Sequence, residues 1–230
     1  MKLIIAIIVV FALLNAAFAA PQKKGDMCGL CVQFADEALE QLIDIIANVG
    51  IAGGCGKLCS HLPAKLEAEA CDVICEIVGI EEFVKAIQKA DLDPIFYCQE
   101  LKLCPIDDCT GQCAKINGVT SVPTKGQSGT TFNIVIDFTV MNKTGTGEFA
   151  INIAPPDGMP FGTGELAANG YVPGNFQMKV GVKTQPSENE PFGPGVYKIQ
   201  TAICEGQCGS KHPHSRIFSE ANGQFTITGQ

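Results

Sequence analysis

Twelve cysteines constrain this chain more than any other feature of its sequence. They occur at close spacing, and the outermost pairs of the first half, Cys28 with Cys31 and Cys98 with Cys104, enclose a long stretch of helical pattern. So many cysteines at such spacings are typical of an oxidising compartment, where they form a disulfide framework. We therefore expect no free thiol in the mature protein.

The first residues predict export from the cell. Lys2 is followed by an apolar run from Leu3 to Leu14 and then by small residues that end at Ala19, which is the layout of a cleaved secretory signal. The run is too short to span a bilayer. We assign residues 1–19 to a signal peptide and expect a secreted, extracellular protein, with lysosomal or storage vesicles as an alternative route.

The first half has the pattern of amphipathic helices. Apolar residues recur every three or four positions from Asp26 to Val49, after Pro63, and from residue 80 to 90. Asp93 and Pro94 are the residue types of a helix N-cap and first turn. Fourteen acidic residues stand against five lysines between positions 26 and 104, so nucleic acid is not expected as a partner, because its binding depends on clustered basic groups.

The cysteines and prolines of this half follow a known order. Cys28-Gly-Leu-Cys31, Cys59-Ser-His-Leu-Pro63, Cys71 and Cys98 to Cys104 together resemble a saposin B-type domain over residues 26–105. The resemblance implies three disulfides, which join Cys28 to Cys104, Cys31 to Cys98, and Cys59 to Cys71.

Two cysteines, Cys55 and Cys75, are additional to that plan. Each lies four residues from a cysteine of the plan, so on a helix it lies one turn away on the same face. Cys55 with Cys75 and Cys59 with Cys71 have the same index sum, as neighbouring rungs of an antiparallel hairpin require. We expect two stacked disulfides, and the alternative is a local link from Cys55 to Cys59.

A small domain held by disulfides depends less on a hydrophobic core, and it can therefore leave apolar side chains free to meet lipid. The apolar stripes of the helices supply the candidates, although each one fits a core position equally well. The lipid-contact candidates are Leu30, Phe34, Leu42, Ile45, Leu66, Val73, Phe83 and Ile87.

The second half, residues 115–230, alternates apolar and polar residues with a period of two, most clearly from Thr131 to Met141. Further alternating runs are predicted at Phe149 to Ile153, Phe176 to Val182, Val196 to Cys204 and Phe225 to Thr228, with a weaker one at Ile116 to Val122. Six or seven short strands separated by segments rich in Gly, Pro and Asn favour an immunoglobulin-like sandwich. The expected fold class is therefore α+β with two domains: an all-α, disulfide-stapled saposin-type helical domain, followed by an immunoglobulin-like β-sandwich.

Two copies of the motif C-x-G-Q-C occur in this half, at Cys109 to Cys113 and at Cys204 to Cys208. Either each motif closes locally, or they cross-link as Cys109 with Cys208 and Cys113 with Cys204. The cross-link is slightly favoured, because it would tie the start of the domain to its end. Asn142-Lys-Thr144 is an N-glycosylation sequon on an expected hairpin turn.

Motifs that carry catalysis are absent from the sequence. The three histidines are His61, His212 and His214, and the last two lie in one short loop segment without an evident third ligand, so we expect neither a metal site nor a cofactor. No nucleophile elbow, zinc-protease motif or phosphate-binding glycine loop occurs. An enzyme is therefore not expected.

A saposin-type segment followed by a cysteine-tied β domain is similar to the countin family, the secreted cell-counting factors of social amoebae. This resemblance implies a non-enzymatic extracellular glycoprotein of cell–cell signalling that regulates group size and cohesion. Its implied partners are other secreted proteins in a complex and a lipid or membrane surface. The alternatives are a membrane-permeabilising protein of the amoebapore kind and a lysosomal lipid-transfer or hydrolase-activator protein.

Overall fold

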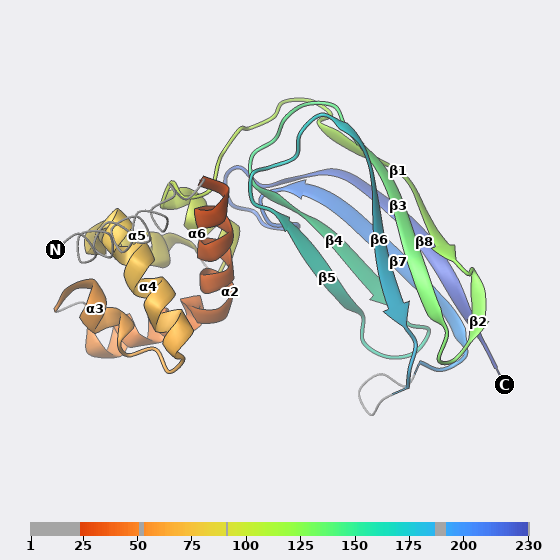
Figure 1. The fold of residues 1–230 in the computed structure, drawn as a ribbon, viewed down its shortest axis with the longest axis horizontal. Coiled ribbons are helices and arrows are strands. Elements are labelled where there is room, and N and C mark those ends of the chain that lie inside the picture. The colour runs from red at the N-terminus through yellow and green to blue at the C-terminus, as the bar shows by residue number, and fades with distance from the viewer. Residues whose placement is uncertain (1–23, 51–52, 91, 187–191, 230) are drawn as a thin grey trace, which may run out of the picture.

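The computed structural model describes residues 24–50, 53–90, 92–186 and 192–229, and it has a helical part followed by a sheet part (Figure 1). The predicted secretion signal at residues 1–19 lies outside the described residues. The helical part contains α2 (Lys24–Val49), α3 (Gly54–Cys59), α4 (Lys65–Val78), α5 (Ile80–Ala90) and α6 (Pro94–Glu100).

Local chemistry explains where these helices begin and end. Asp93 is confirmed as the N-cap of α6, since its Oδ1 accepts a hydrogen bond of 2.9 Å from the backbone N–H of Phe96, and Pro94 occupies the first turn. Gly79, with φ of +87°, ends α4 and lets the chain turn directly into α5.

The core of the helical part lies between α2, α5 and α6. Phe83 stacks against Phe34 at a centroid distance of 6.4 Å and meets Tyr97 edge-on at 6.1 Å, and all three rings are buried. Four disulfides hold the helices around this core: Cys28–Cys104, Cys31–Cys98, Cys55–Cys75 and Cys59–Cys71.

The sheet part contains two sheets, with strand orders β1-β3-β6 and β2-β8-β7-β4-β5. Pairing is antiparallel except between β2 and β8, which run parallel. The strands are β1 (Ala114–Val122), β2 (Lys125–Gln127), β3 (Thr131–Val140), β4 (Gly147–Ala154), β5 (Phe161–Ala167), β6 (Gly174–Lys183), β7 (Gly195–Glu205) and β8 (Arg216–Thr228).

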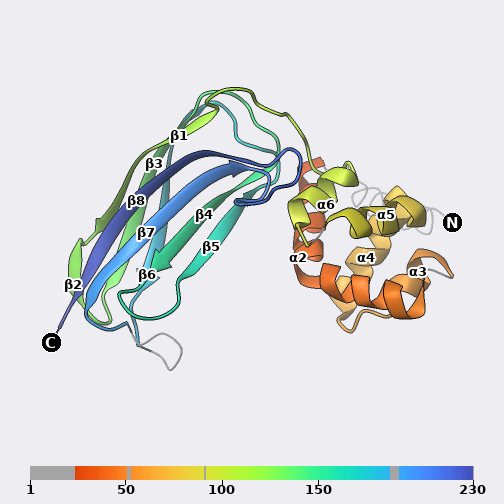
Figure 2. The ribbon, with the colours of Figure 1, turned by 180° about the vertical axis from the view of Figure 1, so that it is seen from behind.

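The two sheets enclose one aromatic core and form an open half-barrel. Phe225 stacks on Phe132 at 4.3 Å and on Tyr197 at 5.0 Å, and these rings come from both sheets. On one side the sheets meet, since the N–H of Ile116 on β1 donates to Ser219 Oγ on β8 at 3.0 Å. The other side ends in the edge strands β5 and β6 (Figure 2).

The fold class predicted from the sequence, a saposin-type domain followed by an immunoglobulin-like sandwich, is wrong. Strands make up the larger share of the regular structure in the described chain, and they form the half-barrel of three and five strands. The helices contact the loop between β7 and β8 through a hydrogen bond and a ring stack. Sequence periodicity identified strands and helices, but it holds no information about how two sheets close or which loops meet the helices.

Across the described ranges, none of the helices combines the length and the apolarity that crossing a membrane requires.

Candidate functional site

The eight predicted lipid-contact residues divide between core and surface. The side chains of Phe34, Leu42, Phe83 and Ile87 are at most 2 % exposed, and they belong to the helical core. Leu30 and Ile45 are partly buried. The remaining two, Leu66 and Val73, are 81 % and 47 % exposed on α4. The surface candidates are therefore confined to one helix.

These two residues belong to an exposed apolar face of α4. Ile77, one turn beyond Val73, is 57 % exposed, and it extends the row that Leu66 begins. Lys65 and Glu69 flank the row and form an ion pair of 3.5 Å. We call Leu66, Val73 and Ile77 the α4 face.

Each C-x-G-Q-C motif closes on itself. The structure pairs Cys109 with Cys113 and Cys204 with Cys208, so the favoured cross-link between the two motifs is wrong. The central glycine explains the local closure. Gly111 and Gly206 have φ of +83° and +65°, a left-handed conformation that turns the chain back within four residues.

Helices and sheets meet at a group of contacts that we call the junction. Asp93 Oδ2 accepts a hydrogen bond of 2.5 Å from Ser210 Oγ, while its other oxygen caps α6. The rings of Phe96 and His212 stack at a centroid distance of 4.2 Å, and their planes differ by 2°. A buried carboxylate and an aromatic stack therefore join α6 to the loop between β7 and β8.

A cleft of about 360 Å³ lies beside the junction. It is lined by apolar side chains from α2, α6 and β5 and by the polar groups of Asp36, Glu148 and Gln207. Glu148 Oε1 accepts a hydrogen bond of 2.6 Å from the N–H of Cys208. Burial raises the pKa of Glu148, this hydrogen bond opposes the rise, and the negative charges of Asp93 and Asp36 add to it.

The linker between the two parts is fixed along its length. The carbonyl of Pro105 accepts a hydrogen bond of 2.8 Å from Thr146 N–H, and Asp107 forms an ion pair of 2.8 Å with Lys143. Asp108 Oδ1 lies 2.5 Å from His214 Nδ1. Asp107 and Asp108 are therefore both bound to the sheet part.

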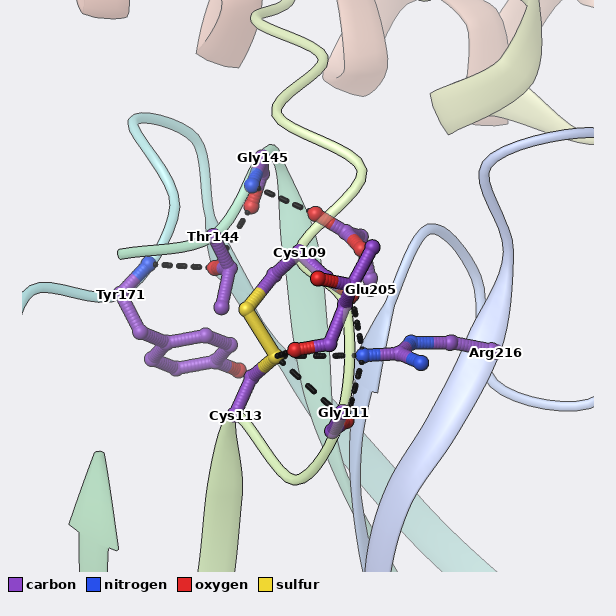
Figure 3. Close-up of a disulfide and its surroundings, with 9 residues drawn as sticks. Cys109, Gly111, Cys113, Thr144, Gly145, Tyr171, Glu205 and Arg216 are labelled. Carbon is purple, nitrogen blue, oxygen red and sulfur yellow. Dashed lines mark hydrogen bonds between the residues drawn. A yellow bond between two sulfur atoms is a disulfide. The ribbon is translucent and has the colours of Figure 1, made fainter. Parts of the chain in front are cut away.

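The Cys109–Cys113 disulfide ends this linker, and Arg216 lies against it (Figure 3). Nη2 of Arg216 lies 3.1 Å from Sγ of Cys113, and it donates to the carbonyl oxygens of Cys109 and of Gly111, the latter at 2.9 Å. In Figure 3 the ring of Tyr171 approaches the disulfide from the side opposite the guanidinium. We call Cys109, Cys113 and Arg216 the linker site.

Glu205 binds backbone groups next to the linker site. Its carboxylate accepts a hydrogen bond of 2.6 Å from Gly145 N–H, and its side chain is buried. Burial raises the pKa of Glu205, whereas the N–H groups of Gly145 and Cys109 and the charge of Arg216 lower it. Gly145 has no room for a Cβ, which would collide with the backbone of Pro105 and Asp107.

The remaining predicted sites lie at separate places. His61 is exposed, whereas His212 and His214 are used in the junction and in the contact with Asp108. Asn142 is exposed, but it lies on a connection between the two sheets and not in a hairpin turn, because β3 and β4 belong to different sheets. Glycosylation of Asn142 stays a prediction. In the part of the chain that the structure describes, no three side chains gather to hold a metal ion.

Sequence reasoning missed the residues that tie the two parts together. Arg216 is the first residue of a strand of which only the end was predicted, and Glu148 and Glu205 look like ordinary charges on strands. The one sequence signal is that Glu148 is the single charged residue of β4, an otherwise apolar or neutral strand, whereas β7 carries Lys198 as well as Glu205.

This geometry defines a class of protein: a disulfide-rich chain in which a helical part and an open half-barrel are joined through a pinned linker. Models of the countin N-terminal domain and the countin C-terminal domain match residues 26–102 and 114–230. The chain therefore belongs to the countin family.

Relatives in Dictyostelium discoideum agree along nearly their whole length. Countin-1 is 36 % identical over 95 % of this chain and 85 % of its own, and Countin-3 is 38 % identical over 89 % and 91 %. Countin-2 is 36 % identical over 98 % and 88 %. A solved Pseudomonas fluorescens alkylpurine DNA glycosylase aligns at a TM-score of 0.37 with 9 % identity, over 85 % of this chain and 47 % of that one, and this likeness carries no argument.

Proposed function

We propose that this chain is a secreted, non-enzymatic factor of countin type that regulates the size and cohesion of cell groups, and that it acts in a complex with other secreted proteins. The observation that carries the proposal is the family match, which extends over both parts of the chain and over almost the whole length of the relatives. Group-size regulation is what the resemblance to this family implies.

Secretion is supported by the cysteines. All twelve are paired in six disulfides, the state expected of a protein that folds in an oxidising compartment. The apolar leader at residues 1–19 supplies the export signal of the same proposal.

A non-enzymatic role is supported by how the charged groups of the junction and of the linker site are used. Glu148 and Glu205 both bind backbone N–H groups, Asp93 caps a helix, and Arg216 binds backbone carbonyls and a disulfide sulfur. These groups maintain the fold, which fits a protein that acts by binding through its surface and not by catalysis.

Deletion and rescue test the proposal in the organism that expresses the chain. Loss of the gene should change the number of cells per group, and the full chain should restore it. A chain that lacks residues 1–19 is the matched control, and it should not restore group size, because it stays inside the cell. Unchanged groups after deletion, or rescue by the leaderless chain, would contradict the proposal.

The α4 face favours lipid contact as a second part of this function. Three apolar side chains stand exposed on a helix whose flanks carry acidic groups, so neutral pH should oppose binding to anionic bilayers. Acidification removes that charge mainly below about pH 5.5, since reference carboxyl pKa values lie near 4. We expect the full chain to bind anionic vesicles more tightly at pH 4.5 than at pH 7.

Vesicle co-sedimentation of the double variant Leu66→Ser and Ile77→Ser tests this contact. The variant should lose most of the acid-induced binding, whereas Met159→Ser, at an equally exposed apolar residue of the sheet part, should not. Dye leakage from the vesicles would indicate a permeabilising protein, and lipid extraction without leakage a transfer protein. Equal binding at both pH values would remove lipid from the proposed function.

A further inference from the structure

The two C-x-G-Q-C motifs form a natural matched pair. Each disulfide spans a separation of four residues around a central glycine in the left-handed region. Each also has one buried cysteine, Cys113 or Cys204, and one partly exposed cysteine, Cys109 or Cys208. Ring size and access to the sulfurs are therefore similar, and the main difference between the motifs is the charge around them.

The first motif has a cation in contact with its buried sulfur. Nη2 of Arg216 lies 3.1 Å from Sγ of Cys113. The guanidinium is held in place by the carbonyl of Gly111 and by the ring of Phe218, whose centroid lies 4.8 Å from Cζ. Cys109, the partly exposed cysteine, lines a hollow of about 240 Å³ together with Asp108, Glu205, His214 and Arg216.

Both motifs have a carboxylate that accepts the N–H of the partly exposed cysteine, Glu205 for Cys109 and Glu148 for Cys208, so the contact that separates the motifs is the cation at Cys113. The N–H of Cys208 donates to the carboxylate of Glu148, and Sγ of Cys208 lies 3.9 Å from the backbone oxygen of the same residue. Glu148 is also the cross-strand partner of Cys204. The hollow beside Cys208 is lined by Asp93, Lys211 and His212.

These charges matter because a disulfide is opened by a thiolate and releases a thiolate. The rate of exchange rises when the leaving thiol has a low pKa, and an adjacent Arg lowers it. A nearby carboxylate acts in the opposite direction, since it repels the attacking and the leaving thiolate alike, but both motifs have one, so the arginine beside Cys113 decides the difference.

We propose that Cys109–Cys113 is an exchangeable disulfide that reacts with an external thiol, whereas Cys204–Cys208 is structural. An external thiolate attacks Sγ of Cys109 and forms a new S–S bond with it. The bond between Cys109 and Cys113 breaks, and its electron pair remains on Sγ of Cys113 as a thiolate beside Arg216. Attack by this thiolate on the mixed disulfide reverses the step, and attack by a second external thiolate on the mixed disulfide leaves both cysteines reduced.

The fold around the linker site tolerates this opening. The linker is held independently by the hydrogen bond from Thr146 to Pro105, by the ion pair of Asp107 with Lys143 and by the contact of Asp108 with His214. A loop of four residues also constrains little of the unfolded chain, so its opening removes little stability compared with the long loops of the helical part.

Timed reduction of the native full chain by glutathione tests the proposal. Free thiols are alkylated at intervals, and each cysteine peptide is quantified by mass spectrometry. Cys109 and Cys113 should be alkylated about tenfold faster than Cys204 and Cys208. Equal rates, or faster opening of the second motif, would overturn the proposal, and this comparison needs no variant that has to fold.

Substitution of the arginine assigns the cause. Arg216→Gln should slow opening of the first motif about tenfold, and Arg216→Lys, which keeps the charge, should retain most of the rate. The rate at Cys204–Cys208 serves as the internal control in each variant. A first motif that opens as fast in Arg216→Gln as in the native chain would overturn the role of the cation.

A variant that traps the mixed disulfide shows whether the external thiol is a small molecule or a cysteine of a partner protein. In Cys113→Ala the thiol of Cys109 has no internal partner, so it forms a stable mixed disulfide by exchange with oxidised glutathione or with a disulfide of a secreted protein. An adduct of glutathione mass indicates a small-molecule thiol, and a reducible protein adduct at Cys109 indicates a partner's cysteine. Absence of both adducts would overturn exchange at this site.

Discussion

The carboxyl groups of Glu148 and Glu205 hold backbone segments in place, but burial makes their charged forms less favourable than in water. Each is withdrawn from water and accepts a backbone N–H, and burial raises the pKa of each. A raised pKa means that the folded state holds the proton more strongly than the unfolded state does. Between the ordinary and the raised pKa, the free energy of unfolding therefore falls as pH rises.

The variant Glu148→Gln tests this pH dependence. Glutamine keeps an oxygen for Cys208 N–H but carries no charge, so the variant should gain thermal stability relative to the native chain as pH rises from 4.5 to 7.5. Melting temperatures from circular dichroism across that range measure the difference. Glu81→Gln, at an exposed position of α5, is the control. A difference that stays constant with pH would contradict the raised pKa.

At the scale of elements, the hairpin of α3 and α4 is held by two stacked disulfides. Cys59–Cys71 has a separation of 12 residues and lies inside Cys55–Cys75, which has a separation of 20. With the inner bridge in place, the outer bridge adds only a small loop, made of the segments between Cys55 and Cys59 and between Cys71 and Cys75. Cys28–Cys104 is nested in the same way outside Cys31–Cys98.

Because of this nesting, the two outer bridges, Cys55–Cys75 and Cys28–Cys104, should contribute similar amounts to the free energy of unfolding. Replacement of Cys55 and Cys75 by alanine should lower the free energy of unfolding by about 2–3 kcal/mol, and replacement of Cys28 and Cys104 by a similar amount, because each inner bridge remains. Guanidinium chloride unfolding of both double variants measures this. A much larger loss for Cys28 and Cys104 would show that total loop length, not nesting, decides the contribution.

Elements with clear periodicity could be predicted from sequence, and the others could not. The alternating run that begins at Thr131 forms β3, and Asp93 caps α6 as expected. β5 was missed because Phe-Gly-Thr-Gly-Glu-Leu-Ala has little alternation, and as an edge strand it buries little. The start of β8 was missed because Asn222-Gly223 looks like a turn, yet Gly223 is needed where β1 passes too close for a Cβ.

At the candidate site, the sequence could not predict which distant residues contact one another. Arg216 and Cys113 are 103 residues apart, and Asp93 and Ser210 are 117 apart. No local pattern reports such contacts. The same applies to the apolar stripes, where Phe83 and Leu66 have the same sequence character but lie in the core and on the surface, respectively.

At the scale of the whole molecule, the junction couples the helices to the half-barrel. Asp93 connects the cap of α6 to the loop after β7, and the Phe96–His212 stack lies on the same loop. Contacts of this kind transmit unfolding of one part to the other, so the chain should unfold as one cooperative unit.

Ser210→Ala removes the hydrogen bond to Asp93 and the one that Ser210 Oγ accepts from His212 N–H, and it leaves the helix cap intact. It should lower the free energy of unfolding by about 1–3 kcal/mol, and combination with His212→Ala should split the single calorimetric transition into two. Ser128→Ala, which removes a hydrogen bond to Thr184 in the sheet part, is the control. A double variant that still unfolds in one transition would show that the junction does not couple the parts.

The pinned linker also decides how the chain meets proteases outside the cell. A protease needs a stretch of backbone that it can pull into an extended form, and exposed connections between structural units ordinarily supply one. Here the carbonyls of Pro105 and Cys113 are bound by Thr146 and Met141, so cleavage must wait for local opening. The helical part and the half-barrel should therefore stay in one chain when extracellular proteases are present. A fragment with only one of them would have to arise from cleavage by a protease specific for this linker.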